Sequence, residues 1–161
     1  MAGESPIGEE IWALAISMEQ IGKDFYEALA LGSDDPQVCR FCVTAAKDEA
    51  RHRESFALMR SRLSESHRVR PLDERVVAEL QALAKQQIQP DPAVVRKVAL
   101  GGKLDDALKM ASNMEKDAIG FYQGLLARLP NLSPLLTPII AEEQSHLRSL
   151  LALGAALSHT S

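Results

Sequence analysis

A helical segment with an inward-facing Glu and His occurs twice in this chain, and this repeat constrains the fold more than any other feature. In the first copy, Glu49 and His52 are three residues apart and share one face of a helix. The remaining positions of that face, in steps of four and three, are apolar: Val38, Cys42, Ala45, Phe56, Met59 and Leu63. A helix buries such a stripe, so the pattern predicts a buried Glu and His.

The second copy lies ninety-four residues later, with Glu143 and His146 at the equivalent positions. Its stripe is again apolar at every step: Leu132, Leu136, Ile139, Leu150, Leu153 and Leu157. The segment before each copy also repeats, with an offset of ninety-six residues that aligns Glu19 with Glu115 and Tyr26 with Tyr122. Each half is therefore predicted to be one helix with an inward Glu followed by a second with an inward Glu-x-x-His.

The fold that we expect is all-α. Two repeated hairpins form a four-helix bundle of the up-down-down-up type, with a long, partly helical crossover between the halves. Its 161 residues suffice for a single domain with a real core. We assign residues 1–161 to one domain, with helices at about 6–31, 36–64, 104–129 and 134–157 and a crossover at 65–102. Pro36 suits a first helical turn, and Ser133 is a candidate N-cap.

The crossover is too apolar for a flexible linker. Two short helices are expected in it, at 72–87 and 93–100, separated by Pro90 and Pro92. We expect them to pack on the bundle or on a second subunit.

Charge and composition exclude several classes of protein. The formal net charge of -4 gives no reason to expect nucleic acid or an acidic membrane as a partner. The N-terminus lacks the basic and apolar regions of a signal peptide, and no apolar run is long enough to span a bilayer. Two cysteines cannot build a disulfide framework, which fits a reducing compartment. We expect a cytoplasmic protein.

The repeat directs four carboxylates and two imidazoles to one interior. Burying these charges is costly unless something compensates them, and metal ions do so in place of protons. Oxygen and nitrogen ligands in this mixture suit iron or manganese, and the set matches that of di-iron carboxylate bundles. We expect two iron ions, with manganese or zinc as substitutes. The alternative is a duplicated hairpin whose buried Glu and His residues pair only with each other.

The chain resembles the rubrerythrin-type branch of the ferritin-like superfamily over most of its length. Four motifs carry the resemblance: Met18-Glu19 with Phe25-Tyr26, Glu49-Ala50-Arg51-His52, Met114-Glu115 with Phe121-Tyr122, and Glu143-Gln144-Ser145-His146. It implies a ferritin-like bundle and a role for each of six residues: bridging for Glu49 and Glu143, capping for Glu19 and Glu115, and terminal nitrogen ligation for His52 and His146.

Four further residues are candidates for holding these ligands in place: Tyr26, Tyr122, Asp48 and Glu142. Each tyrosine lies two turns beyond a capping Glu and can hydrogen-bond a ligand carboxylate, although a buried core aromatic fits the pattern equally well. The two acids directly precede the bridging glutamates. They can orient the histidine of the opposite hairpin, or they are plain surface acids.

The resemblance implies a non-haem di-iron centre that reacts with hydrogen peroxide or dioxygen, by peroxide reduction or ferroxidase-type Fe(II) oxidation. It suggests a role in oxidative stress and a homodimer, with no catalytic side chain beyond the metal centre. Rubrerythrins carry a further carboxylate where this chain has Ala118, and their two C-x-x-C knuckles are absent, so we expect an external electron donor. The alternatives are an iron-binding or storage protein with little turnover, and a structural bundle stabilised by metal.

Cys39 and Cys42 form a single C-x-x-C pair near the start of the second helix. Such a pair can be redox-active and pass electrons to a nearby site. Cys42, however, aligns with Leu136 in the repeat, and a free Cys is often a small buried apolar residue. We therefore favour core packing.

Overall fold

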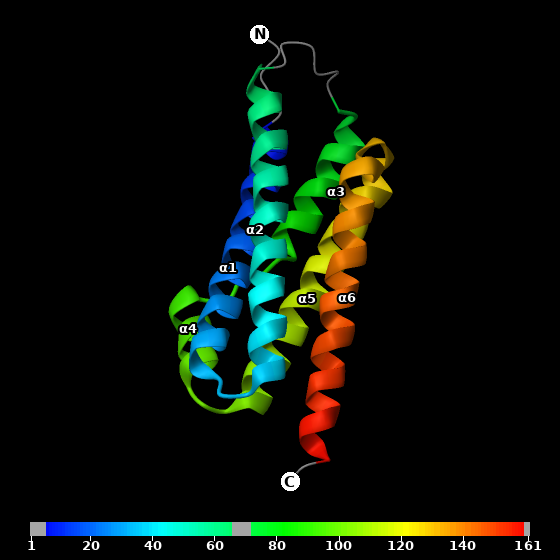
Figure 1. Cartoon of the computed structure of the whole chain (residues 1–161). Coiled ribbons are helices and arrows are strands. Elements are labelled where there is room, and N and C mark those ends of the chain that lie inside the picture. The colour runs from blue at the N-terminus through cyan, green and yellow to red at the C-terminus, as the bar shows by residue number, and fades with distance from the viewer. Residues whose placement is uncertain (1–5, 66–71, 160–161) are drawn as a thin grey trace.

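Long antiparallel helices give the molecule its shape (Figure 1). The computed structural model describes residues 6–65 and 72–159, without the side chains of residues 6 and 63–65. One hairpin consists of α1 (Pro6–Gly32) and α2 (Pro36–Glu65), and the other of α5 (Leu104–Arg128) and α6 (Ser133–Ser158). In Figure 1, α1 runs downward, α2 and α5 upward and α6 downward. This is the predicted up-down-down-up order seen from its other end, so the all-α ferritin-like bundle is confirmed.

The turn within each hairpin follows from local sequence. Before α2, the Asp35 carboxylate accepts hydrogen bonds from the backbone N–H groups of Gln37 and Val38, at 2.8 and 3.2 Å, and Pro36 begins the helix. Before α6, the prediction that Ser133 is the N-cap is wrong. A short 3-10 helix (Pro130–Leu132) runs directly into α6, so Ser133 already has helical dihedral angles (φ −53°, ψ −42°). Its hydroxyl lies 2.9 Å from that of Thr137 instead.

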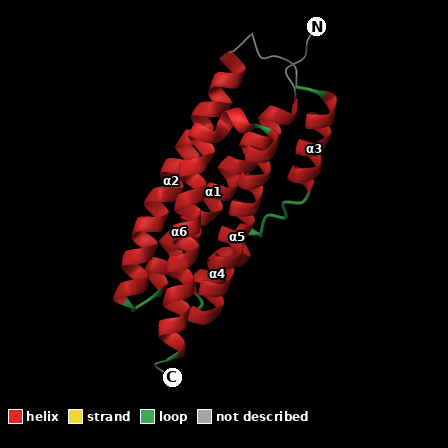
Figure 2. Ribbon diagram, turned by 90° about the vertical axis from the view of Figure 1, so that its right-hand side faces the viewer, coloured by secondary structure: helices red, strands yellow, loops and turns green. Residues whose placement is uncertain are grey.

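The crossover contains α3 (Glu74–Lys85) and α4 (Pro92–Leu100). Helix α3 is two residues shorter at each end than expected. At its start, the Asp73 carboxylate caps it by accepting from the backbone N–H of Arg75 at 2.8 Å. Both helices pack on the bundle, α3 chiefly on α5 and α4 chiefly on α1. The approach is close: a Cβ built on Gly124 of α5 would lie only 2.8 Å from a methyl of Leu83 of α3. Figure 2 shows the loop that leaves α3 and returns to the bundle.

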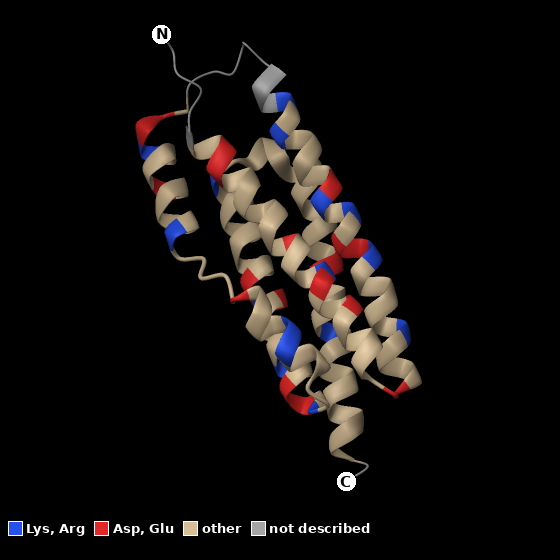
Figure 3. Cartoon of the chain, turned by 90° about the vertical axis from the view of Figure 1, so that its left-hand side faces the viewer, with Lys and Arg blue, Asp and Glu red and all other residues tan. Residues whose placement is uncertain are grey.

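Two apolar clusters fill the core, and the polar side chains lie between them. Along α1, residues 7–15 contribute to one cluster and residues 25–29 to the other, with Glu19 between. Figure 3 likewise shows acidic positions midway along the helices. The side chain of Leu63, expected on the inward stripe of α2, lies outside the described residues. Within the described part of the chain, no helix combines the length and apolarity needed to cross a membrane.

Candidate metal centre

The six predicted ligand side chains come together in the middle of the bundle. They come from all four long helices, and all six residues are buried: Glu19 on α1, Glu49 and His52 on α2, Glu115 on α5, and Glu143 and His146 on α6. On each helix, these polar residues interrupt an otherwise apolar inward stripe, and the interruptions lie at the same height in the bundle. The repeat thus produces a buried polar layer enclosed by the two apolar clusters.

Within this layer, the side chains form two groups of four whose ligand atoms lie within 4.8 Å of one another. One group combines Glu19 and His52 with two shared carboxylates, and the other combines Glu115 and His146 with the same two. The shared carboxylates belong to Glu49 and Glu143. Two cation sites that share two carboxylates are therefore available in the part of the chain that is described.

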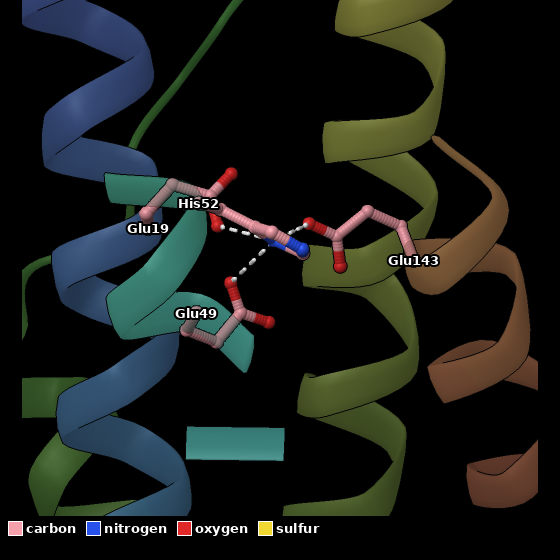
Figure 4. A group of neighbouring side chains, drawn as sticks. All are labelled: Glu19, Glu49, His52 and Glu143. Atoms are coloured by element: carbon pink, nitrogen blue, oxygen red, sulfur yellow. Dashed lines mark hydrogen bonds and ion pairs between the residues drawn. The ribbon is translucent and has the colours of Figure 1, made fainter. Parts of the chain in front are cut away.

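The first group is centred on the Nδ1 atom of His52 (Figure 4). This nitrogen lies 3.0 Å from a carboxylate oxygen of Glu143, 3.2 Å from one of Glu19 and 3.9 Å from one of Glu49. The three acids come from three different helices, so the geometry depends on the packing of the whole bundle and not on one local motif.

The second group repeats this arrangement around Nδ1 of His146. That nitrogen lies 3.2 Å from a carboxylate oxygen of Glu143 and 3.5 Å from one each of Glu49 and Glu115. The two halves of the chain therefore contribute equivalent halves of the site, as the internal repeat requires.

The outer nitrogens of the two histidines bind acids from the opposite hairpin. His52 Nε2 lies 2.5 Å from Glu142, and His146 Nε2 lies 3.1 Å from Asp48. An Nε2–H that donates to a carboxylate leaves the Nδ1 lone pair free to face the site. Arg51 joins the two acids: its guanidinium contacts Glu142 at 3.1 and 3.2 Å and also Asp48.

Arg51 is the residue that sequence reasoning missed. Its position in the second half is Ser145, so the repeat gives no signal for it. The only indication in the sequence is its position directly before His52 and shortly after the two acids Asp48 and Glu49. It neutralises an acidic pair on the outer side of both histidines.

Each tyrosine donates a hydrogen bond to a glutamate of the other hairpin. The Tyr26 hydroxyl of α1 donates to Glu115 of α5, and the Tyr122 hydroxyl of α5 donates to Glu19 of α1. Both rings are fully buried. Tyr122 occupies Oε1 of Glu19, which leaves Oε2 facing His52. Each phenol thus fixes the orientation of a carboxylate from the other half of the bundle.

The sequence model of the rubrerythrin family, described as Rubrerythrin, matches residues 10–154. The chain belongs to the rubrerythrin family. The match includes both Glu-x-x-His pairs and both single glutamates, together with the tyrosines that hold them. Searches of curated proteins and of solved structures returned no match.

The pKa shifts at the site of this rubrerythrin-family chain show how unfavourable it is to bury so many carboxylates without cations. Burial raises the pKa of Glu115 to about 8, and burial followed by repulsion from Glu19 and Glu143 raises the pKa of Glu49 well above its usual value. Burial disfavours the charged form of His52, but the hydrogen bonds that it donates to Glu143 and Glu19 outweigh burial and raise its pKa to about 10. Protons on Glu49, Glu115 and His52 therefore offset the buried negative charge when no metal does.

The donor set fits a pair of divalent cations. Two such ions compensate four carboxylates while both imidazoles stay neutral, which removes the need for the extra protons. Gly22 adds a structural reason: a Cβ built there would lie 3.3 Å from the Glu49 carboxyl carbon. The absent side chain on α1 thus leaves room for a carboxylate of α2. The cluster is compatible with the di-iron site of the rubrerythrin family.

The two cysteines lie near the start of α2. Cys42 is in the apolar core, and Cys39 lies beside the connection from α1. Cys42 is fully buried in the apolar cluster that contains Val38 and Ala45. The Cys39 thiol donates toward the carbonyl oxygens of Ala30 and Ser33, at 3.5 and 3.2 Å. Burial, followed by the neighbouring Cys39, raises the pKa of Cys42 to about 12.

Iodoacetamide at pH 8 is therefore expected to leave Cys42 unmodified in the native protein and to modify it in guanidinium. Since the thiolate is the nucleophile, a pKa of about 12 leaves roughly one thiol in ten thousand reactive at this pH. Peptide mass spectrometry before and after unfolding measures this. Fast native labelling of Cys42 would instead support the redox-pair interpretation.

Proposed function

We propose that this rubrerythrin-family chain binds two iron ions and reacts with hydrogen peroxide or dioxygen as a di-iron oxidoreductase. The observation that carries the proposal is the pair of overlapping four-residue groups that share Glu49 and Glu143. Two shared carboxylates hold two ions close to each other, which is what a two-electron reaction at a metal pair needs. Manganese or zinc would fit the same donors.

Iron bound there would supply one electron from each ion to an O–O bond. The protein itself would supply the ligands and hold them in position. Glu49 and Glu143 would contribute to both metal positions, and Glu19 and Glu115 to one position each. The Nδ1 atoms of His52 and His146 complete the donor set, and these six residues are the ligands that we propose. Residues outside this set fix its geometry in advance, so that little reorganisation accompanies metal binding.

The surrounding residues hold protons at defined atoms. Glu142 and Asp48 keep a proton on the outer nitrogen of each histidine, at 2.5 and 3.1 Å. The phenol protons of Tyr26 and Tyr122 point at the capping carboxylates. Burial, followed by the nearby carboxylates, raises the pKa of both phenols well above the usual value. The two tyrosines therefore remain proton donors throughout the physiological range.

Turnover would require an external electron donor, because the chain itself holds no source for the two electrons that reduce each peroxide. The proposal also includes the homodimer and the cytoplasmic location that the family resemblance suggests. It assigns the protein to the removal of peroxide under oxidative stress.

The test is peroxide decay in the presence of a chemical reductant. Protein loaded anaerobically with Fe(II) is mixed with excess hydrogen peroxide and ascorbate, and the peroxide is followed over time. We expect many peroxides consumed per chain, and none with Zn(II)-loaded protein. Oxidation that stops after one round and leaves a ferric core would favour iron storage. A metal that resists oxidation altogether would favour the structural role.

A further inference from the structure

A cavity of about 50 Å³ adjoins the site on the side formed by α1 and α5. The carboxylates of Glu19, Glu49, Glu115 and Glu143 line its inner end, and residues 87–90 of the loop between α3 and α4 line its outer end. The space accommodates a few water-sized molecules, since one water needs roughly 10–15 Å³ of it. The cavity therefore connects the ligand carboxylates with a surface loop.

An ion-pair network covers the opposite side of the site. There the outer nitrogens of His52 and His146 are occupied by Glu142 and Asp48, and Arg51 ties these two acids together. A molecule arriving from that side would have to displace an ion-pair network. The side of α1 and α5 needs no such displacement.

Small residues at equivalent positions of the repeat keep the cavity open. Gly22 on α1 and Ala118 on α5 both line it. The Glu49 carboxylate takes up the space beside Gly22, where a Cβ would meet it at 3.3 Å. Ala118, which is 9% exposed, lies against the cavity itself, so a larger side chain at this position would narrow it.

The loop over the cavity is fastened to α1 through one side chain. The Ser17 hydroxyl donates to the Gln89 amide oxygen at 2.7 Å, and the Gln89 amide nitrogen donates to the Leu14 carbonyl at 3.4 Å. Ile21, Gln89 and Pro90 line both the cavity and an open groove on the outer surface. These three residues therefore lie between the cavity and the outer groove. Figure 2 shows the loop that carries two of them.

The walls define which molecules the cavity accepts. Apart from the four carboxylates at the inner end and the polar side chains of Gln87, Gln89 and Asp117, it is lined largely by apolar side chains such as Met18, Ile21, Met114 and Pro90. Carboxylates repel anions at short range, and apolar walls disfavour any charge. The chemistry selects a small uncharged molecule with a polar end directed at the carboxylates and at most a short apolar tail.

We propose that hydrogen peroxide and short-chain alkyl hydroperoxides reach the site from the outer groove past Gln89, and that Ala118 sets the largest tail that fits. This inference rests on the proposed peroxide reaction and adds its substrate class and access route. It identifies Ala118 as a specificity-determining residue that is not a metal ligand.

The test compares Ala118→Leu with Ala127→Leu, which makes the same change at an exposed position of the same helix. Both are loaded with Fe(II) and mixed with hydrogen peroxide or ethyl hydroperoxide. Bound iron per chain is measured first, and we expect it to be unchanged in both. Ala118→Leu should lower the rate with ethyl hydroperoxide about tenfold or more relative to hydrogen peroxide, as changes of one or a few methylenes in a pocket do. Ala127→Leu should change neither rate.

Two further measurements separate the possible outcomes. Crystals under xenon pressure should show xenon in the cavity of the native protein and none in Ala118→Leu, a result that does not depend on iron. If Ala118→Leu fails to fold, Ala118→Val serves with the same expectations. Native protein that consumes both peroxides while the variant keeps the same ratio of rates would overturn the inference alone. Native iron-loaded protein that consumes neither would overturn the proposed function and this inference with it.

Discussion

Glu143→Gln is expected to abolish the binding of both metal ions, whereas Glu115→Gln is expected to leave one. Glu143 belongs to both groups of ligand atoms, but Glu115 belongs to only one. An amide lacks the charge and the second oxygen ligand that a shared carboxylate provides. In an anaerobic Fe(II) titration, native protein should bind about two ions per chain, as this ligand set does in di-iron bundles.

The control is Glu27→Gln, which makes the same exchange on the surface of α1, where Glu27 pairs with Lys23. It should bind iron as the native chain does. Equal stoichiometry for the two buried variants would contradict the assignment of Glu143 as a shared ligand. Two ions bound by Glu143→Gln would contradict the site as a whole.

Metal should raise the melting temperature of the protein strongly. The folded chain gathers six ligand side chains that the unfolded chain separates, so binding stabilises only the folded state. At a concentration of one hundred times the dissociation constant, each site contributes about 2.7 kcal/mol, or about 5 kcal/mol for two independent sites. For a chain of this size, where 1 kcal/mol shifts the midpoint by about 2–4 °C, the increase should be roughly 10–20 °C.

Thermal melts with and without Mn(II) measure this effect without the complication of oxidation in air. Glu143→Gln provides the matched control and should melt at the same temperature with and without metal. A shift of less than about 2 °C in the native protein would mean that the six residues form a buried ion network. The alternative interpretation of the repeat would then be correct.

The repeat made the fold and the meeting of six polar side chains predictable from sequence. Helical periodicity shows which residues share a face, so Glu49 and His52 could be assigned to the inward side of α2. The equivalence of the two halves then placed Glu143 and His146 opposite them. Both inferences need only the spacing of residues within one helix and a reason for burial.

Contacts that depend on how neighbouring helices are placed along each other could not be predicted. That Tyr26 reaches Glu115 and not Glu19 of its own helix depends on the relative height of α1 and α5. Arg51 acts through a long side chain that reaches across to α6, and the repeat has no second copy of it. Ser133 failed as a cap because the preceding residues are already helical, which is a feature of the connection and not of the helix.

The loop at residues 87–90 illustrates the same limit. Its sequence indicates only a break between two short helices, and nothing in it points to the metal site. Its position over the cavity follows from the packing of α3 on α5 and of α4 on α1. Substrate access is thus set by tertiary packing, whereas the ligands are set by the repeat.

Anomalous diffraction from crystals soaked anaerobically in Fe(II) tests the central claim most directly. The account predicts two iron peaks in the polar layer, one within each group of four side chains, with Glu49 and Glu143 contacting both. Iron found only at surface acids, or no anomalous density between the four helices, would contradict it.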